Sequence, residues 1–167
     1  MNNNMNVLSV LVTNHAGVLS RVAWLFSRRM YNIESLSVGV TENPEISRMT
    51  IVTYADEDTL KQIMNQLAKL VDVRDIKELE PDNSVYRELA LVKVRTNSEQ
   101  RQGVISVADI FRAKIIDVAS DSLIVELTGN QAKIDAFLNL LEGYEILELA
   151  RTGIAGLGRG TENVTYL

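Results

Sequence analysis

The first 80 residues alternate between two hydrophobic periodicities, which indicate strands and helices in turn. Residues 7–13 are a β-rich run that ends at the turn-forming Asn14. From Val18 onward the apolar residues fall three or four positions apart, which is the spacing of one face of a helix. Residues 33–40 return to strict alternation of apolar and small polar side chains, and this pattern predicts a half-buried strand.

The rest of the first half completes a pattern of six elements. Residues 48–54 form another β-rich run after a loop that contains Pro44. Residues 56–58 lead a segment with helical spacing up to Leu70, and residues 73–79 form a last strand. The predicted order is therefore strand, helix, strand, strand, helix, strand.

The second half repeats this order as a diverged copy. Residues 89–94 correspond to the first strand at an offset of 82 residues, and residues 115–118 correspond to 33–36 at the same offset. Past the central hairpin the offset falls to 74 and then 71, so length is lost only in the turns. Two such units predict an α+β protein made of two tandem ferredoxin-like βαββαβ domains. The expected bounds are a first domain over 1–80, a linker over 81–84, a second domain over 85–152 and a C-terminal tail over 153–167.

In this fold both helices cover one face of the sheet, which leaves the other face bare. In the first half that face includes Ser35, Ser37 and Gly39, which are small or polar. Such a face, or the edge of its sheet, is usually covered by a partner. We therefore expect a homodimer or a larger assembly.

Composition excludes several functional classes. The chain has 22 acidic and 17 basic residues and a net charge of −5, so nucleic acid is not an expected partner. Without cysteine and with His15 as its one histidine, it has no thiol nucleophile, Cys/His zinc site or Ser-His-Asp triad. No acidic cluster has metal-binding spacing, and no segment approaches the roughly 20 apolar residues of a membrane span. We expect a cytoplasmic protein that binds neither a metal ion nor a membrane.

The most informative segment is the loop between the first strand and the first helix. A helix N-terminus presents unpaired N–H groups that suit a carboxylate, and Gly17 lets a ligand approach the backbone. The Asn14 amide can donate and accept, as binding an α-amino acid requires. The plainer alternative is that Asn14 forms an Asx turn or N-cap and that Gly17 only packs. The repeat favours function, because Asn14 and Gly17 map onto Thr96 and Glu99 in the second copy.

Several motifs along the chain resemble the small regulatory subunit of acetolactate synthase, also called acetohydroxyacid synthase. The resemblance covers nearly the whole chain, in order. The stretches that carry it are Asn14-x-x-Gly17-x-Leu19-Ser20-Arg21, residues 31–36 (YNIESL), 47–50 (SRMT), 70–73 (LVDV), 87–94 (RELALVKV), 110–118 (IFRAKIIDV) and 150–153 (ARTG).

The resemblance implies an N-terminal ACT domain, a second ferredoxin-like domain, and dimerisation. It also implies feedback control of valine, leucine and isoleucine biosynthesis, with valine as the usual effector. The chain would be non-catalytic and would activate a catalytic large subunit, on which thiamine diphosphate, magnesium and FAD are expected. The effector would lie between two ACT domains and would be held by Asn14, His15, Ala16, Gly17, Val18 and Leu19 of one subunit and by Asn32 and Ile33 of the other.

Two positions depart from the family pattern. Met30 stands where the family often has glycine before the aromatic-Asn-Ile stretch, and Ala113 stands where it often has glycine after Phe-Arg. A left-handed helix cap at either position would cost a non-glycine residue about 1 kcal/mol.

Other features have plainer interpretations. His15 is expected to contribute its backbone more than its side chain, and Trp24 is expected to pack in the core. The glycines of residues 153–160 resemble a nucleotide loop, but no helix follows them, so we expect a flexible tail.

Three alternative functions remain open. The chain could be an ACT-type amino-acid sensor that regulates another enzyme or belongs to a transcription regulator, although no basic helix-turn-helix segment is present. It could be an RNA-recognition fold, for which Tyr54 alone offers too little stacking surface. It could also be a small hydrolase of the acylphosphatase type, which assay of the isolated protein would reveal.

Overall fold

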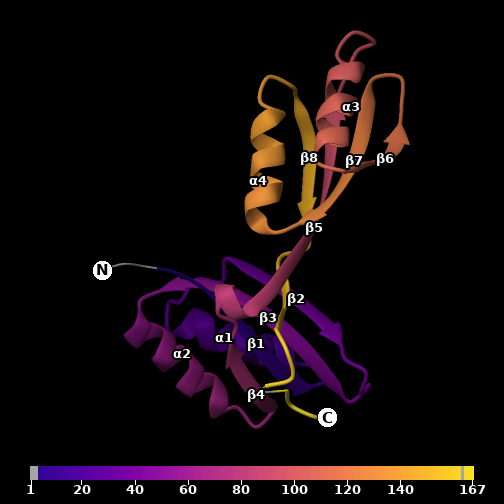
Figure 1. Cartoon of the computed structure of the whole chain (residues 1–167). Coiled ribbons are helices and arrows are strands. Elements are labelled where there is room, and N and C mark those ends of the chain that lie inside the picture. Colours follow the sequence, from indigo (N-terminus) through magenta and orange to yellow (C-terminus); the bar gives the residue numbers. More distant parts are fainter. Residues whose placement is uncertain (1–3, 163) are drawn as a thin grey trace. The chain divides into compact units, whose positions relative to one another are not determined.

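A computed structural model describes residues 4–162 and 164–167 of the chain (Figure 1). The chain divides into two compact units, one formed by the chain up to Val85 together with Ile154–Leu167, and the other formed by Tyr86–Gly153. The first part of the chain contains β1 (Asn4–Thr13), α1 (Val18–Arg28), β2 (Ser35–Val40), β3 (Ile46–Ala55), α2 (Glu57–Ala68) and β4 (Val73–Glu78). A 3-10 turn (Pro81–Asn83) leads into β5 (Ser84–Arg95), α3 (Arg101–Ile110), β6 (Lys114–Val118), β7 (Ser122–Gly129), α4 (Gln131–Leu140), β8 (Ile146–Arg151) and β9 (Ala155–Gly158).

Both sheets have the strand order of the predicted fold. The first sheet runs β2-β3-β1-β4, and the second runs β6-β7-β5-β8 with β9 paired to β5. Neighbouring strands of each sheet are antiparallel. The α+β class and the tandem ferredoxin-like arrangement predicted from the sequence are therefore confirmed.

Each unit has its own hydrophobic core between one sheet face and two helices. In β1 the alternate residues Leu8, Val10 and Val12 face α1 and α2 and are almost completely buried. In β5 the positions 82 residues later, Ala90, Val92 and Val94, pack in the same way against α3 and α4. Apolar burial on this scale is the main contribution to the stability of each unit.

The two units share irregular features as well as strand order. The pairing of β1 with β4 shifts register between Leu11 and Val12, and the pairing of β5 with β8 shifts between Lys93 and Val94, again 82 residues later. A shared bulge is more specific than a shared strand order, because bulges are local departures from a regular ladder. The internal repeat predicted from the sequence is therefore present in the geometry of both sheets.

Both strand-connecting helices α1 and α3 end in the same left-handed turn. Met30 has φ +58° and Arg112 has φ +54°, although neither is glycine. After α1, the Tyr31 N–H donates to the Phe26 carbonyl at 2.9 Å and the Met30 N–H donates to the Ser27 carbonyl at 3.0 Å, which together form a Schellman cap. The predicted left-handed residue is correct at Met30, but in the second unit it is Arg112 and not Ala113.

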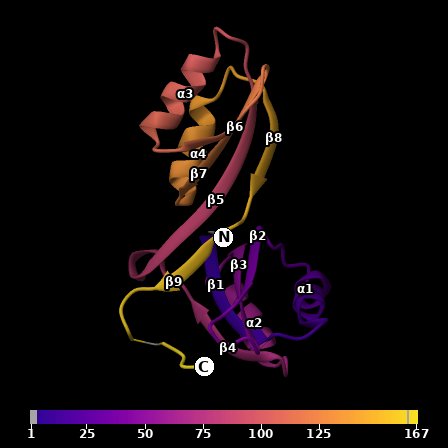
Figure 2. The same cartoon turned by 90° about the vertical axis from the view of Figure 1, so that its right-hand side faces the viewer.

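The C-terminal segment contacts the face of the first sheet that does not face the helices. This face was expected to be bare within the chain and its covering tail to be flexible, but Ile154 is only 3% exposed and its N–H donates to the Ser35 hydroxyl at 3.3 Å. The Thr165 hydroxyl donates to the Asp75 carboxylate at 2.5 Å. Figure 2 shows the chain running from β9 back past β4. The expectation failed because glycine content does not reveal what a segment packs against.

Replacing Met30 by glycine should stabilise the protein. The side chain is 92% exposed, so its removal loses little burial, whereas glycine adopts the left-handed conformation without strain. We expect the free energy of unfolding to rise by about 0.5 to 1 kcal/mol in urea denaturation. The control is Arg29→Gly, because Arg29 has φ −93° and no left-handed strain to relieve; a destabilised Met30→Gly protein would contradict the assignment.

Replacing Ile154 by alanine should destabilise the protein, because the buried side chain helps cover the first sheet. We expect a loss of about 2 to 4 kcal/mol in the free energy of unfolding. Leu157→Ala is the matched control in the same segment, since Leu157 is 60% exposed and should change stability by less than about 0.5 kcal/mol. Equal effects of the two substitutions would show that the segment does not pack on the sheet.

Candidate functional site

The loop between β1 and α1 is held to the neighbouring hairpin loop by Asn14. Its backbone N–H donates to the Glu45 carbonyl at 2.7 Å, and its Nδ2 donates to the Pro44 carbonyl at 2.8 Å. Its Oδ1 accepts from the Ser47 hydroxyl at 3.2 Å. Asn14 therefore forms neither an N-cap nor an Asx turn, the two plain alternatives. Each of its amide atoms retains capacity for one more hydrogen bond toward solvent.

Gly17 begins α1 in a conformation that favours glycine. Its φ is +87° and no side chain caps the helix. Within residues 4–162 and 164–167, the N–H groups of Gly17, Leu19 and Ser20 have no hydrogen-bond acceptor. The Val18 N–H has only a long bond of 3.4 Å to the His15 carbonyl. The positive end of the helix dipole and these unpaired donors therefore face outward together.

The corresponding turn of the second unit is closed by its own side chains. The Asn97 Oδ1 accepts from the N–H groups of Glu99 at 3.0 Å and Gln100 at 2.8 Å. The Gln100 side chain in turn accepts from the Asn97 N–H at 3.3 Å. This reciprocal arrangement is a capping box in which the orphan donors are satisfied internally. The open helix N-terminus is thus a property of the first repeat and is not required to build the turn.

An ion pair that the sequence analysis missed lies beside Gly17. Arg21 Nε donates to Asp72 Oδ2 at 2.7 Å, and the Thr13 hydroxyl donates to Asp72 Oδ1 at 3.2 Å. Arg21 Nη1 lies 3.2 Å from the point that a Cβ on Gly17 would occupy. The guanidinium therefore adds positive charge where the unpaired N–H groups are, and Asp72 offsets part of the resulting repulsion.

Only half of this pair has a local signal in the sequence. Arg21 follows Gly17 by four residues, so the helical spacing alone places the two on one face. Asp72 is 51 residues from Arg21 and reaches it only because β4 pairs with β1. The hydrogen bond from Arg21 holds the pKa of the Asp72 carboxyl below its ordinary value, and the hydrogen bond from Thr13 acts in the same direction.

The other predicted residues of this loop differ in what they expose. His15 and Ala16 are exposed, whereas the Val18 side chain is 2% exposed in the core, so that only its backbone can meet a ligand. Leu19 is 46% exposed and offers an apolar surface next to the unpaired N–H groups. The loop thus combines anion-binding donors with an apolar contact.

Asn32 and Ile33 lie at the opposite end of the same sheet. They precede Ser35, which pairs with Val52, whereas the loop follows Thr13, which pairs with Ile46. Val52 also pairs with Val7, so the two parts of the predicted site are separated by about six strand residues, or roughly 20 Å. One chain therefore does not bring the two halves of the predicted site together.

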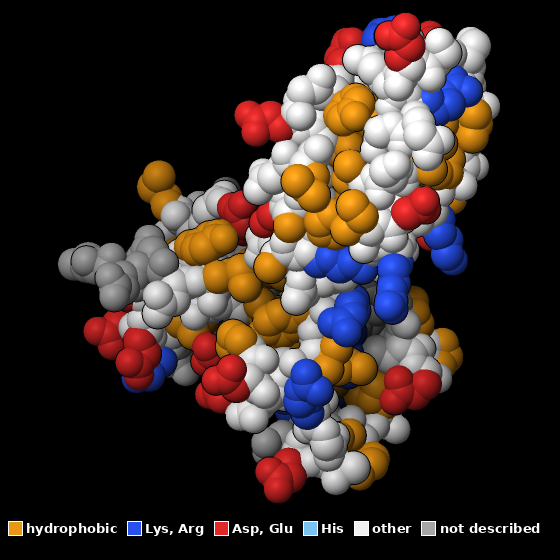
Figure 3. All heavy atoms as spheres, turned by 45° about the horizontal axis from the view of Figure 1, so that its top comes forward, with side chains coloured by type: hydrophobic (Ala, Val, Ile, Leu, Met, Phe, Trp, Pro, Cys, Tyr) orange, Lys and Arg blue, Asp and Glu red, His pale blue; other side chains and the backbone are white. Residues whose placement is uncertain are grey.

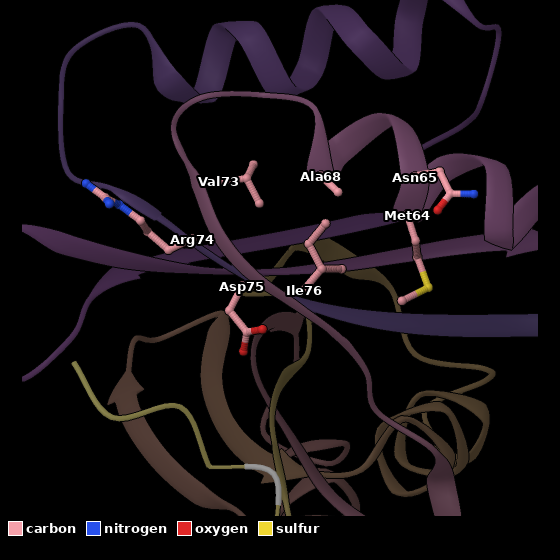
Figure 4. Close-up of a pocket in the computed structure, with 7 residues that line it drawn as sticks. All are labelled: Met64, Asn65, Ala68, Val73, Arg74, Asp75 and Ile76. Carbon is pink, nitrogen blue, oxygen red and sulfur yellow. The ribbon is translucent and has the colours of Figure 1, made fainter.

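A hollow of about 350 Å³ lies elsewhere in the first unit, between α2 and β4. In Figure 4, Met64, Ala68 and Ile76 lie along this space, whereas Asp75 points away from it. Its lining offers no charged group that converges on the space, so we do not assign the effector to it. Figure 3 shows acidic side chains scattered over one face of the molecule without a single patch. In the described residues there is no group of three or more acidic or histidine side chains arranged to hold a metal ion.

Two family matches cover most of the chain. Residues 8–75 match a family described as AHAS small subunit-like ACT domain, and residues 87–160 match one described as small subunit of acetolactate synthase. No helix in the described part of the chain is long and apolar enough to cross a membrane.

Individual relatives match over almost their full length. The acetolactate synthase small subunit of Mycolicibacterium smegmatis is 48% identical over 159 residues, which cover 95% of this chain and 94% of that protein. The probable acetolactate synthase small subunit of Methanothermobacter thermautotrophicus is 49% identical and covers 95% of each chain. The crystal structure of the acetolactate synthase small subunit from Thermotoga maritima matches with a TM-score of 0.88 at 42% identity, over 95% of this chain and 99% of that chain.

The ion pair of Asp72 should make stability depend on pH. Because the folded-state pKa is lowered, Asp72 stabilises the native state above its unfolded pKa of about 3.9 and loses this effect as pH falls through the folded value. Asp72→Asn should therefore lower the free energy of unfolding at neutral pH and converge with the wild type in acid. The control is Asp82→Asn, an exposed position in the turn before β5; curves that stay parallel down to acid pH would rule out this role of Asp72.

Proposed function

The chain belongs to the family of acetolactate synthase small subunits, and from this premise we propose that it is a cytoplasmic, non-catalytic regulatory subunit. In this proposal it activates a separate catalytic subunit and confers feedback inhibition by a branched-chain amino acid, with valine as the first candidate. The family matches over both units support a regulatory subunit of this enzyme.

The observation that carries the effector site is the uncapped N-terminus of α1. In our proposal the α-carboxylate of the amino acid accepts from the N–H groups of Leu19 and Ser20, with the Arg21 guanidinium alongside. The ammonium group donates to Asn14 Oδ1, which retains a lone pair, and the aliphatic side chain lies against Leu19. These contacts match the three parts of a branched-chain amino acid.

A homodimer would complete the site. β2 is an edge strand, and Val38 and Val40 on it are 45% and 58% exposed. If two β2 strands pair antiparallel about a two-fold axis, the end of one lies next to the start of the other. That pairing brings the loop of one subunit to Asn32 and Ile33 of the second copy, which a single chain cannot do. We therefore propose two equivalent effector sites per dimer, each built from both subunits.

Reconstitution with the catalytic subunit tests the function. The purified chain alone should not convert pyruvate to acetolactate, whereas its addition should raise the activity of the catalytic subunit and make that activity sensitive to valine. Turnover by the chain alone, or a catalytic subunit whose rate and valine response do not change, would contradict the proposal. An amino-acid sensor for another system would give the second of these results.

Substitutions at Gly17 test the effector site. Gly17→Asp places a carboxylate beside Arg21 Nη1 and repels the carboxylate of the ligand. Losing two charge-assisted hydrogen bonds, at about 1.5 to 3 kcal/mol each, should weaken valine inhibition on the order of a hundredfold or more, while activation of the catalytic subunit persists. The measurement is the valine concentration for half-maximal inhibition of the reconstituted enzyme.

Two controls separate charge from backbone strain. Gly17→Ala imposes a similar left-handed strain of about 1 kcal/mol without charge, so its valine response should shift far less than that of Gly17→Asp. Glu99→Asp puts the same side chain at the equivalent position of the second repeat and should leave inhibition unchanged. Equal responses of Gly17→Asp and the wild type would show that this loop is only a turn.

A further inference from the structure

Arg48 lies on the face of the first sheet that α1 and α2 do not cover. It belongs to β3, and its cross-strand partners are Leu11 in β1 and Gly39 in β2. Other residues on this face are small and polar, because the same register aligns Ser9 and Ser37 with Thr50. A long cationic side chain therefore stands among side chains that are much shorter.

The charge of Arg48 has no carboxylate partner within residues 4–162 and 164–167. Its Nη1 donates to the Ser9 hydroxyl at 2.6 Å, and Ser9 itself is 3% exposed. By contrast, Arg21 is paired with Asp72, and Lys77 is paired with Asp75. Arg48 is half-buried, so the sheet removes part of its hydration without supplying a counter-charge. The bond to Ser9 orients the guanidinium while leaving its other N–H donors available.

Gly39 leaves room for an incoming group next to Arg48. An added Cβ on Gly39 would meet no atom within 4 Å, and the residue is exposed. The C-terminal segment contacts this face elsewhere, at Ser35 and at Asp75. The surface around Arg48 is therefore open and lets a partner's side chain come close to the sheet.

We propose that this surface, formed by Arg48, Ser9, Ser37, Gly39 and Thr50, docks an acidic side chain of the catalytic chain. A guanidinium on a flat face binds a carboxylate in a two-pronged geometry that supplies both charge and direction. The proposal rests on the proposed function, which supplies a catalytic partner.

Charge complementarity argues against a second copy as the occupant. A two-fold contact would place this surface against itself, and so would face Arg48 with the same cation. The carboxylate nearest in register, Asp75, already accepts from Lys77 and Thr165. The missing counter-charge must therefore come from a different chain.

Binding of the catalytic subunit to immobilised full-length chain tests the inference. Arg48→Gln should raise the dissociation constant about tenfold or more, because it removes one partner of a desolvated charge pair. Arg29→Gln removes an exposed arginine at the end of α1 and should leave the dissociation constant unchanged. Gly39→Val should also weaken binding, since its side chain fills the space beside Arg48 without contacting the rest of the protein.

Valine binding and dimer size of each variant should match the wild type, which excludes misfolding and loss of the effector site as causes. Wild-type binding to the catalytic subunit by either Arg48→Gln or Gly39→Val would overturn the inference, and so would equal weakening by Arg29→Gln. A wild-type chain that does not bind the catalytic subunit would instead contradict the proposed function.

Discussion

The pairing of β1 between β3 and β4 is the interaction on which the first unit depends. The ten residues of β1 pair in register with β3, and this fixes which of them face the helices. Where the strand ends, the Thr13 N–H donates to the Asp72 carbonyl and the Asn14 N–H donates to the Glu45 carbonyl. The loop that follows is thus attached to both neighbouring connections before α1 begins. A rigid start is what a loop needs if its backbone is to recognise a small ligand.

The two repeats use the same turn for different ends. In the second unit Asn97 and Gln100 satisfy the first N–H groups of the helix from within the loop. In the first unit Gly17 replaces such a cap, and the loop asparagine bonds to the hairpin loop instead. The first helix therefore keeps unpaired donors that its counterpart has lost. An unpaired donor at the surface is solvated by water, so it remains available to a carboxylate at little cost.

The two faces of the first sheet are also treated differently. One face is closed by α1 and α2 around Leu8, Val10 and Val12. The other is contacted by the C-terminal segment at Ser35 and carries the unpaired charge of Arg48. Because Ile154–Leu167 packs with the first unit after the chain has formed the second, the first unit is complete only when the whole chain is present. Its fold and its interaction surfaces consequently depend on both ends of the sequence.

The sequence by itself determined the order of elements, the repeat and the position of the loop, because hydrophobic period and turn residues are local signals. It also placed the left-handed cap at Met30, but it missed the cap at Arg112 by one residue because nothing local distinguishes Arg112 from Ala113. Only the tertiary structure decided that Asp72 joins Arg21, that Ile154 is buried, and that Asn32 lies at the far end of the sheet from the loop. Each of these depends on strand register or on contacts between distant segments, which no short stretch of sequence encodes.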